Sequence, residues 1–431
     1  MVKRLKVAPN SKEFKILYLS NSPTVPSGYG VQCAGNCYDW LKYYDVRVLA
    51  NYGIQANMMG LNGLTIYAPL NDDPHGNRSA DLIFKHWKPD LFVTLYDIWM
   101  GAYVREAGMP TLAPIHPFWV PIIMVDHEPV PESTVLSARA SYKCVSPTKW
   151  GTDQLHRYGV PQAEHIPFGI DTKLWRPLES KEEQRQIKNT LGKNTMAFSL
   201  QKHLPINEDS FLIHINGANK DPYRKAFMRM FTALQIFLEQ NPDAKSDVRV
   251  YVHSWMRMAR DIPHGAKVLH VEEYCSGAAD YHMMQGVPME RMAEIARSAD
   301  VFFHLSEGGG FEVPLLEAMA SGVPPIYLDF VANKELCDGR GWDIPVIKSK
   351  TGAIAKYFTP LDATQGIADE FLAAEALAEV YNSPGKRADL GEKGRNFSLD
   401  YDWSKVNPMW IDFIEKMRDE TSYKPLTERR L

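Results

Sequence analysis

One stretch decides the fold class of this chain, and it reads Phe302-Phe-His-Leu-Ser-Glu307-Gly-Gly-Gly310-Phe-Glu312-Val-Pro-Leu-Leu-Glu317-Ala-Met-Ala-Ser-Gly322-Val-Pro. It has the pattern of a buried strand, a glycine-rich loop and a short helix from Val313 to Ser321, which Gly322 ends. A strand followed by a loop and a helix is the repeating unit of parallel α/β sheets, whose ligands bind at the carboxyl ends of the strands. We therefore expect an α/β protein with a ligand site at this loop.

The same alternation of β-rich runs and helical patterns extends over most of the chain. The strands predicted in the first half are 16–20, 46–50, 91–95, 122–125, 142–145 and 164–166. Those predicted in the second half are 211–215, 248–252, 301–305 and 326–328, with a helix over about 225–240. Several of these runs are almost entirely apolar, as strands covered on both faces must be. The sequence thus predicts two α/β domains of similar size.

A polar, charge-dense stretch at Leu178–Asn194 interrupts the alternation and places a domain boundary near Thr172. Near the end, the run 401–410 leads into an amphipathic helix through Ile414 and Met417, with no strand predicted after it. Such a helix has to bury its aromatic face on a part of the protein that is already folded.

Composition limits the classes of protein to which the chain can belong. With 431 residues, 23% of them charged and 45% hydrophobic, and a net charge of −4, it is neither disordered, collagen-like nor a basic nucleic-acid-coating protein. The 5 cysteines are too few and too scattered for a disulfide framework, which favours a reducing, cytoplasmic location. The first residues lack the apolar core of a signal peptide, and no apolar run reaches the roughly 18 residues of a membrane span. Peripheral membrane contact stays open.

The loop after the first strand contains Gly28-Tyr29-Gly30, with a helix expected from about Val31. Glycines between a strand and a helix let backbone N–H groups approach a phosphate. A nicotinamide site is disfavoured, because the second strand ends in Leu49-Ala-Asn51 without the acidic residue that would hold a ribose. An anion- or sugar-contacting loop and a plain turn are the two remaining interpretations.

Three ionisable residues, Asp126-His127-Glu128, follow the predicted strand 122–125 and would line the ligand crevice of an α/β sheet. Consecutive residues of an extended chain point in alternate directions, so a shared metal ion is less favoured. Ordinary loop polarity is the other alternative.

In the second half, Gly217, Asn219 and three cations, Lys220, Arg224 and Lys225, run from a strand into a helix. Cations at a helix N-terminus oppose the helix dipole, and an anionic ligand would remove the conflict. Solvated surface lysines are the alternative. Glu317 stands in an otherwise apolar helix, where its carboxylate could accept hydrogen bonds from two adjacent hydroxyls of a ribose, or could face solvent.

Taken in order, these motifs resemble those of the retaining GT-B glycosyltransferases of family 4, the glycosyl transferases group 1. The resemblance covers nearly the whole chain, and it rests on the glycine loop at 28–30, residues 89–99, His127, 145–149, 165–171, the pair Arg224-Lys225 and residues 317–324. It implies two Rossmann-like α/β/α domains facing across a cleft. Residues 1–172 plus 397–431 would form the acceptor-side domain, with the last helix crossing back to it, and residues 173–396 would bind the nucleotide sugar.

The resemblance implies a hexosyl- or pentosyltransferase that moves a sugar from a nucleoside-diphosphate sugar to an acceptor, with retention of configuration and without metal or another cofactor. The catalytic residues would then be His127, which would contact the transferred sugar, and Arg224 and Lys225, which would neutralise the diphosphate. Glu317 would hold the ribose. The other donor-binding residues would be Gly28, Tyr29, Gly30, Gly217, Asn219, Lys220, Glu307, Gly309, Gly310, Phe311 and Glu312. The acceptor, whether a glycan, a lipid, a small molecule or a modified nucleic-acid base, is not indicated.

One departure from the family pattern concerns the donated sugar. The first family glutamate stands eight residues before the second, at the position of Gly309 here, while glutamates occur instead at Glu307 and Glu312. Glu307 could reach the same space, and the backbone amides of 308–311 would still line the site. The departure keeps a catalytically weakened nucleotide-sugar-binding protein as one alternative. A GT-B-like isomerase or phosphorylase, which would share the two-domain cleft, is the other.

Overall fold

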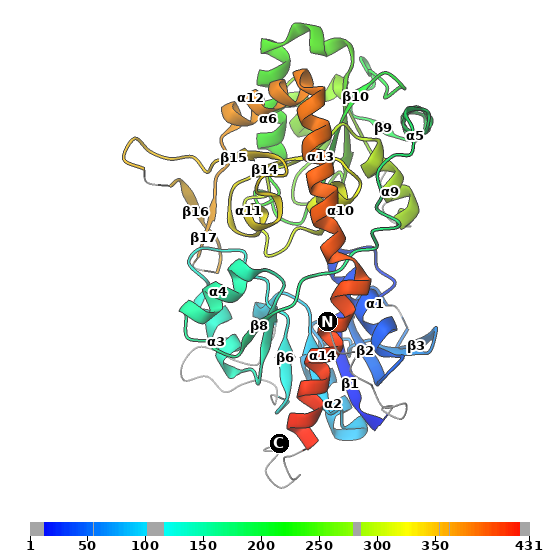
Figure 1. Cartoon of the computed structure of the whole chain (residues 1–431), viewed down its shortest axis with the longest axis vertical. Helices are drawn as coiled ribbons and strands as arrows, with labels where there is room; N and C mark the ends of the chain where they lie inside the picture. The colour runs from blue at the N-terminus through cyan, green and yellow to red at the C-terminus, as the bar shows by residue number, and fades with distance from the viewer. Residues whose placement is uncertain are drawn as a thin grey trace. The chain divides into compact units, whose positions relative to one another are not determined.

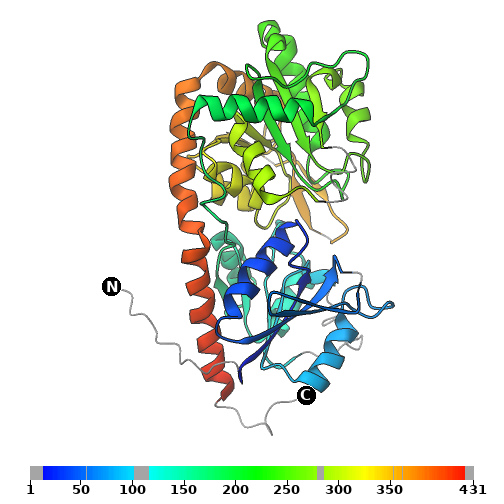
Figure 2. The same cartoon turned by 90° about the vertical axis from the view of Figure 1, so that its right-hand side faces the viewer.

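The computed structural model describes residues 13–54, 56–100, 116–278, 286–352, 354–361 and 363–422. The chain divides into two units (Figures 1 and 2). Unit 1 consists of Met1–Val125, Val130–Gly169 and Trp403–Leu431, and unit 2 of Asp126–Pro129 and Ile170–Asp402. Each unit has its own largely parallel sheet with helices packed around it.

The sheet of unit 1 has six strands in the order β3-β4-β2-β1-β5-β6. Its strands are β1 (Lys15–Asn21), β2 (Asp45–Tyr52), β3 (Met58–Leu61), β4 (Leu64–Tyr67), β5 (Leu91–Thr94) and β6 (Trp119–Pro121), and a small second sheet joins β7 (Cys144–Ser146) to β8 (Ala163–His165). All pairs are parallel except the β3–β4 hairpin. The helices are α1 (Gly28–Trp40), α2 (Asn77–Trp87), α3 (Glu132–Ala140), α4 (Lys149–Arg157) and α14 (Trp403–Ser422), with a 3₁₀ turn η2 (Ile98–Met100).

Two boundaries predicted in unit 1 were wrong. The strand expected at 122–125 is β6, at Trp119–Pro121, because Pro121 cannot donate to the ladder and pairing passes to β7 at Ile122. The helix expected from Val31 begins at Gly28, because the Ser27 hydroxyl caps it by accepting a hydrogen bond from the Gly30 N–H at 3.1 Å. Gly28 and Gly30 therefore lie in the first turn of α1.

The predicted amphipathic helix at the end of the chain is α14, and it buries its aromatic face in unit 1. The Trp410 ring lies 5.4 Å from that of Trp40 in α1, and Tyr44 donates to Glu415 over 2.6 Å. Trp403, at the start of α14, lies so close to Gly35 and Gly169 that a Cβ at either glycine would lie within 2.6 Å of ring atoms. Both positions therefore have to be glycine.

The sheet of unit 2 has seven strands in the order β15-β14-β13-β10-β11-β12-β9, and only β9 is antiparallel to its neighbour. Its strands are β9 (Met196–Ala197), β10 (Phe211–Asn216), β11 (Val248–His253), β12 (Cys275–Gly277), β13 (Val301–His304), β14 (Pro325–Leu328) and β15 (Trp342–Ile344), and β16 (Lys356–Phe358) pairs with β17 (Thr364–Gly366) in a separate hairpin. The helices are α5 (Lys181–Lys193), α6 (Phe227–Gln240), α7 (Ile262–Val268), α9 (Met289–Ser298), α10 (Val313–Ala320), α11 (Val331–Cys337), α12 (Glu370–Asn382) and α13 (Pro384–Ser398). The 3₁₀ turns are η3 (Pro242–Ser246), η4 (Glu272–Tyr274) and η5 (Leu399–Tyr401).

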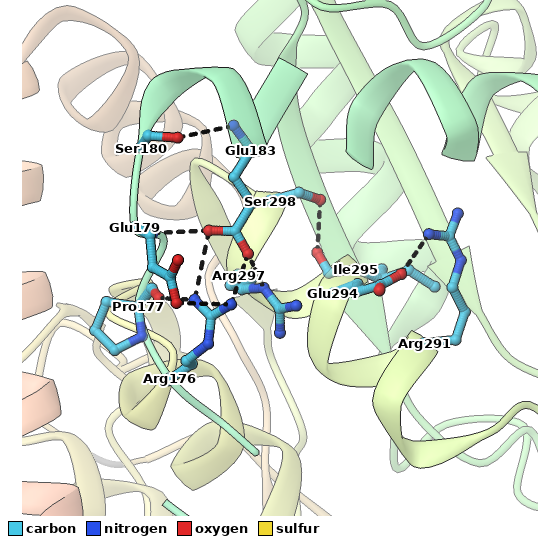
Figure 3. A network of polar contacts seen from close by, with 10 residues as sticks. All are labelled: Arg176, Pro177, Glu179, Ser180, Glu183, Arg291, Glu294, Ile295, Arg297 and Ser298. Atoms are coloured by element: carbon cyan, nitrogen blue, oxygen red, sulfur yellow. Dashed lines mark hydrogen bonds and ion pairs between the residues drawn. The ribbon is translucent and has the colours of Figure 1, made fainter. Parts of the chain in front are cut away.

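The charge-dense stretch 178–194 forms α5, which a polar network attaches to the rest of unit 2 (Figure 3). Glu183 in α5 accepts from Arg176 at 2.9 Å and from Arg297 of α9 at 3.0 Å, and its own N–H donates to the capping Ser180 at 3.1 Å. The polarity that marked a domain boundary in the sequence therefore belongs to a helix of unit 2.

The middle of this sheet positions the candidate site. β10 and β13 are parallel neighbours, so the loops that follow them emerge at the same edge. The quoted stretch forms β13, its loop and α10, as predicted, with Gly322 in the left-handed region at a φ of 77°. The helix expected from Lys225 begins at Phe227 instead, because Ala226 has a φ of 50°, outside helical geometry.

Candidate functional site

The loop after β10 is fastened by the buried side chain of Asn219. Its Nδ2 atom donates to the carbonyl oxygens of Trp255 at 2.9 Å and Arg260 at 2.7 Å, and its Oδ1 accepts from the Arg260 N–H at 3.0 Å. Gly217 accepts from the Ser254 hydroxyl at 2.7 Å, while Lys220 is exposed. The side-chain amide of Asn219 thus holds the loop in place, and both of its hydrogens are already used, so it has none left to donate to a ligand.

Lys225, at the end of this loop, points into unit 2 and is only 8% exposed. Its ammonium donates to Glu312 Oε1 at 2.5 Å and to the Ser306 hydroxyl at 3.2 Å. Burial lowers the pKa of Lys225 to about 8, although the attraction of Glu312 acts in the opposite direction. The neighbouring Arg224 donates to the Gly308 carbonyl at 3.2 Å, so both cations contact the glycine-rich segment after β13.

Glu312 stands at the N-cap position of α10 without capping the helix. Its Oε1 also accepts from the Ser306 hydroxyl at 2.9 Å, and its Oε2 lies 3.4 Å from His304 Nε2. Burial alone would raise the pKa of this carboxyl, but Lys225 and His304 hold it well below the ordinary value. Glu312 is therefore an ionised, buried carboxylate.

Position 309 lies directly beside this carboxylate. A Cβ on Gly309 would lie 2.7 Å from Glu312 Cδ and closer still to Oε1. Similarly, a Cβ on Gly308 would lie 2.9 Å from Gln365 Cγ. Glu312, and not Glu307, thus occupies the space beside the position where the family carries its first glutamate.

Glu307 faces a different partner. Its carboxylate lies 2.5 Å from Arg229 Nε in α6 and accepts from the Ala368 N–H at 3.3 Å. Burial raises its pKa to about 7, because it outweighs the attraction of Arg229. Gly310 and Phe311, between the two glutamates, are buried, and the Phe311 ring lies 6.1 Å from that of Tyr401.

Glu317 is 8% exposed, so the interpretation as a solvated helix face was wrong. It lines a small cavity together with Trp175, Asn216 and His214. Burial raises the pKa of Glu317 to about 8 and lowers that of His214 to about 3, so it favours the uncharged form of both side chains. Neither ring nitrogen of His214 has a hydrogen-bond partner among the described residues.

His127 belongs to unit 2 and is held from both ring nitrogens. Its Nδ1 lies 2.6 Å from Asp126 Oδ1, and its Nε2 lies 3.0 Å from the Thr359 hydroxyl and 3.4 Å from Gln365 Nε2. A carboxylate at Nδ1 favours the tautomer with the proton on that nitrogen, which leaves Nε2 as an acceptor. Within the described ranges, no three His, Cys, Asp or Glu side chains are grouped as metal ligands.

The remaining predicted residues lie in unit 1, at the start of α1. Tyr29 donates to Asp97 over 2.7 Å. A Cβ on Gly30 would lie 2.9 Å from the Ser22 carbonyl oxygen, so the tight turn requires glycine, whereas Gly28 faces open space.

Sequence reasoning missed several residues of the site. Ser306 and His304 lie in the quoted stretch, and Arg229 follows Lys225 by four residues, so spacing in the sequence could have suggested them. Thr359 and Gln365 come from the β16–β17 hairpin, which carries no motif.

Residues 224–369 match the model of a protein family described as glycosyl transferases group 1. Among curated proteins, the MMP alpha-(1->4)-mannosyltransferase of Mycolicibacterium hassiacum is 24% identical over 289 residues, which are 67% of this chain and 54% of that protein. The chain thus spans about half the length of the curated relative that it matches.

Two similar solved structures share the architecture of almost the whole chain. Sucrose-phosphate synthase from Thermosynechococcus elongatus is 13% identical with a TM-score of 0.68, and the match covers 94% of this chain and 100% of that one. Anabaena HepE in complex with UDP-glucose is also 13% identical, with a TM-score of 0.64 and coverage of 93% and 99%. At this identity they show the fold alone, and they confirm the predicted GT-B class.

Proposed function

We propose that this protein is a retaining glycosyltransferase, because residues 224–369 match the glycosyl transferases group 1 model and the chain has the GT-B fold. It would transfer a hexose or pentose from a nucleoside-diphosphate sugar to an acceptor nucleophile. HepE has been solved with UDP-glucose, and the curated relative is a mannosyltransferase, which supports a hexose donor.

The observation that carries the proposal is the meeting of Arg224 and Lys225 with the glycine-rich loop after β13. Both cations and the N-terminus of α10 lie at the carboxyl edge of one parallel sheet. Backbone N–H groups at a helix start and nearby cations favour a diphosphate. As the glycosidic bond breaks, the leaving diphosphate gains negative charge, and cations fixed beforehand stabilise it in the transition state.

We propose roles for the other predicted residues that are consistent with this arrangement. Glu317 would bind the ribose hydroxyls, and the protonated state favoured by its burial would let it donate as well as accept. His127, whose ring Asp126 fixes at Nδ1, would contact the transferred sugar. Lys220 is exposed and would reach the outer side of the diphosphate.

Arg224 and Lys225 would supply the positive charge for which other transferases use a metal ion, and we therefore propose metal-independent transfer. The acceptor is not assigned. Among the described helices, none combines the length and the apolarity that crossing a bilayer requires. A cytoplasmic location, with or without peripheral membrane contact, stays a prediction.

A thermal-shift panel of UDP, GDP and ADP tests the nucleotide part of the proposal, because a ligand of the native state raises the melting temperature with its affinity. Lys225→Ala and Glu317→Ala should reduce the shift, while Glu379→Gln, in an exposed ion pair with Lys386, should not. Nucleotide binding that survives in both site variants would refute the site.

Turnover of the matching nucleotide sugar separates the remaining functions. Release of nucleoside diphosphate that depends on an added acceptor supports transfer. Formation of a sugar epimer without acceptor would instead identify an isomerase. Binding without any turnover would identify a nucleotide-sugar-binding protein.

A further inference from the structure

The Glu312 side chain fills the space that a side chain at position 309 would need. A Cβ at position 309 would lie 2.7 Å from Glu312 Cδ and 2.8 Å from Cγ, whereas real Cβ atoms essentially never approach another atom within 3.0 Å. Gly309 does not have a positive φ, so its backbone conformation does not require glycine. The glycine is needed because the Glu312 side chain lies against it.

The same carboxylate forms an ion pair with Lys225, a cation that is predicted to bind the diphosphate. Glu312 and Lys225 are 5% and 8% exposed, and their charged atoms are 2.5 Å apart. Because Glu312 offsets part of its charge at this distance, Lys225 attracts a further anion less strongly than an unpaired ammonium would.

The pair keeps hydrogen-bonding capacity for a neutral ligand. Among the described residues, Lys225 Nζ donates to Glu312 and Ser306, which uses two of its three N–H groups. The Glu312 carboxylate can accept about four hydrogen bonds, and it has three polar neighbours, Lys225, Ser306 and His304. A donor and an acceptor side by side match a hydroxyl group, which both donates and accepts.

The substrate and the product of sugar transfer differ in charge where they would meet this pair. A terminal phosphate carries a second negative charge at neutral pH, since its second pKa is about 6. In a nucleoside-diphosphate sugar, the sugar is esterified to that oxygen and the charge is absent. A phosphate oxygen about 2.8 Å from Lys225 Nζ would lie within about 5 to 6 Å of Glu312 Oε1, because Nζ and Oε1 are 2.5 Å apart.

Building on the proposed function, we propose that Glu312 makes the site prefer the sugar-bearing nucleotide over the free nucleoside diphosphate. Its carboxylate accepts hydrogen bonds from hydroxyls of the transferred sugar and repels the extra charge that the product carries. The sugar donor is thereby retained and the spent nucleotide released.

The test compares affinities in the full chain by calorimetry, with UDP against UDP-glucose and GDP against GDP-mannose as probes. In Glu312→Gln, the amide oxygen can still accept from Lys225 and Ser306, but the charge is lost. Removing one charge at this distance should tighten the free diphosphate at least about threefold. The affinity for the sugar nucleotide should stay the same or weaken. The dissociation constant of the free diphosphate divided by that of the sugar nucleotide should therefore fall at least about threefold in Glu312→Gln. Glu379→Gln should leave the ratio unchanged.

Equal changes for both ligands, or a higher ratio in Glu312→Gln, overturn the inference but leave the proposed function standing. A wild-type chain that binds none of UDP, GDP and ADP overturns both.

A stability comparison covers the case in which Glu312→Gln does not fold. Gly309→Ala should lower the melting temperature of the wild type by at least about 2 °C but have little effect in a Glu312→Ala background. The same loss in both backgrounds would show that positions 309 and 312 do not share space, and it would overturn the inference.

Discussion

Arg229 Nε lies 2.5 Å from Glu307 Oε1, and the same guanidinium contacts Glu370 through Nη1 at 2.5 Å. This arginine of α6 therefore joins the loop after β13 to the start of α12. Glu307 is 1% exposed, so Arg229 is the group that compensates for its burial.

Arg229→Ala should lower the free energy of unfolding by about 1 to 3 kcal/mol, because a buried carboxyl loses its charged partner. Urea denaturation of unit 2 measures the loss. Lys386→Ala, which breaks an ion pair with both side chains 47% exposed, should change stability by less than about 1 kcal/mol. Equal losses in the two variants would contradict the role of Arg229.

Glu317 should make stability depend on pH. Its folded pKa of about 8 lies above the ordinary glutamate value of about 4.3, so the folded chain holds more protons than the unfolded chain between these values. The free energy of unfolding therefore falls as pH rises through this window. In Glu317→Gln, the free energy of unfolding should fall less steeply between pH 7 and 8. This range is chosen because it lies above the pKa of Glu307, which is about 7. Denaturation curves at several pH values decide, and an unchanged slope would exclude Glu317 as the source.

Asp126→Asn should reduce turnover by at least about tenfold with little effect on the melting temperature, because His127 loses the partner that fixes its tautomer. Glu128→Gln is the matched control, since the Glu128 side chain is 53% exposed and pairs with Lys356. Initial rates of nucleotide release measure the difference. If the two variants behave alike, Asp126 does not act through His127.

Gly169→Ala should destabilise unit 1 by about 1 to 3 kcal/mol, because its Cβ would overlap the Trp403 ring. Gly60→Ala, in β3, has nothing within 4 Å of the added atom and should not show this loss. Thermal unfolding compares the two, and an equal response would mean that Trp403 moves aside freely.

A chelator should leave turnover unchanged, since Arg224 and Lys225 are proposed to supply the positive charge for the diphosphate. Activity in the presence of EDTA, with and without later addition of Mg²⁺, checks this expectation. Loss with EDTA and recovery with Mg²⁺ would disprove metal independence.

The architecture was predictable where local pattern and burial agree. The apolar runs of β10 and β13 and the stop at Gly322 follow from side-chain periodicity and backbone freedom, and they put the glycine-rich loop at the correct edge of the sheet. Boundaries failed where one side chain overrode the pattern, as Ser27 did at α1 and Pro121 did at β6.

The site was only partly predictable, because a sequence does not say in which direction a side chain points. Glu307 and Glu312 are equivalent in a linear reading, yet one faces Arg229 and the other Lys225. Gln365 is far from Gly308 along the chain, and only the folded hairpin brings them together.

The side-chain amide of Asn219 has a consequence for how a ligand is captured. Both of its hydrogens and one lone pair of its oxygen already bond Trp255 and Arg260, so these bonds hold the loop that carries Arg224 and Lys225 without the help of a ligand. Little conformational entropy is then left to lose at this loop on association, so a larger share of the contact energy remains as affinity.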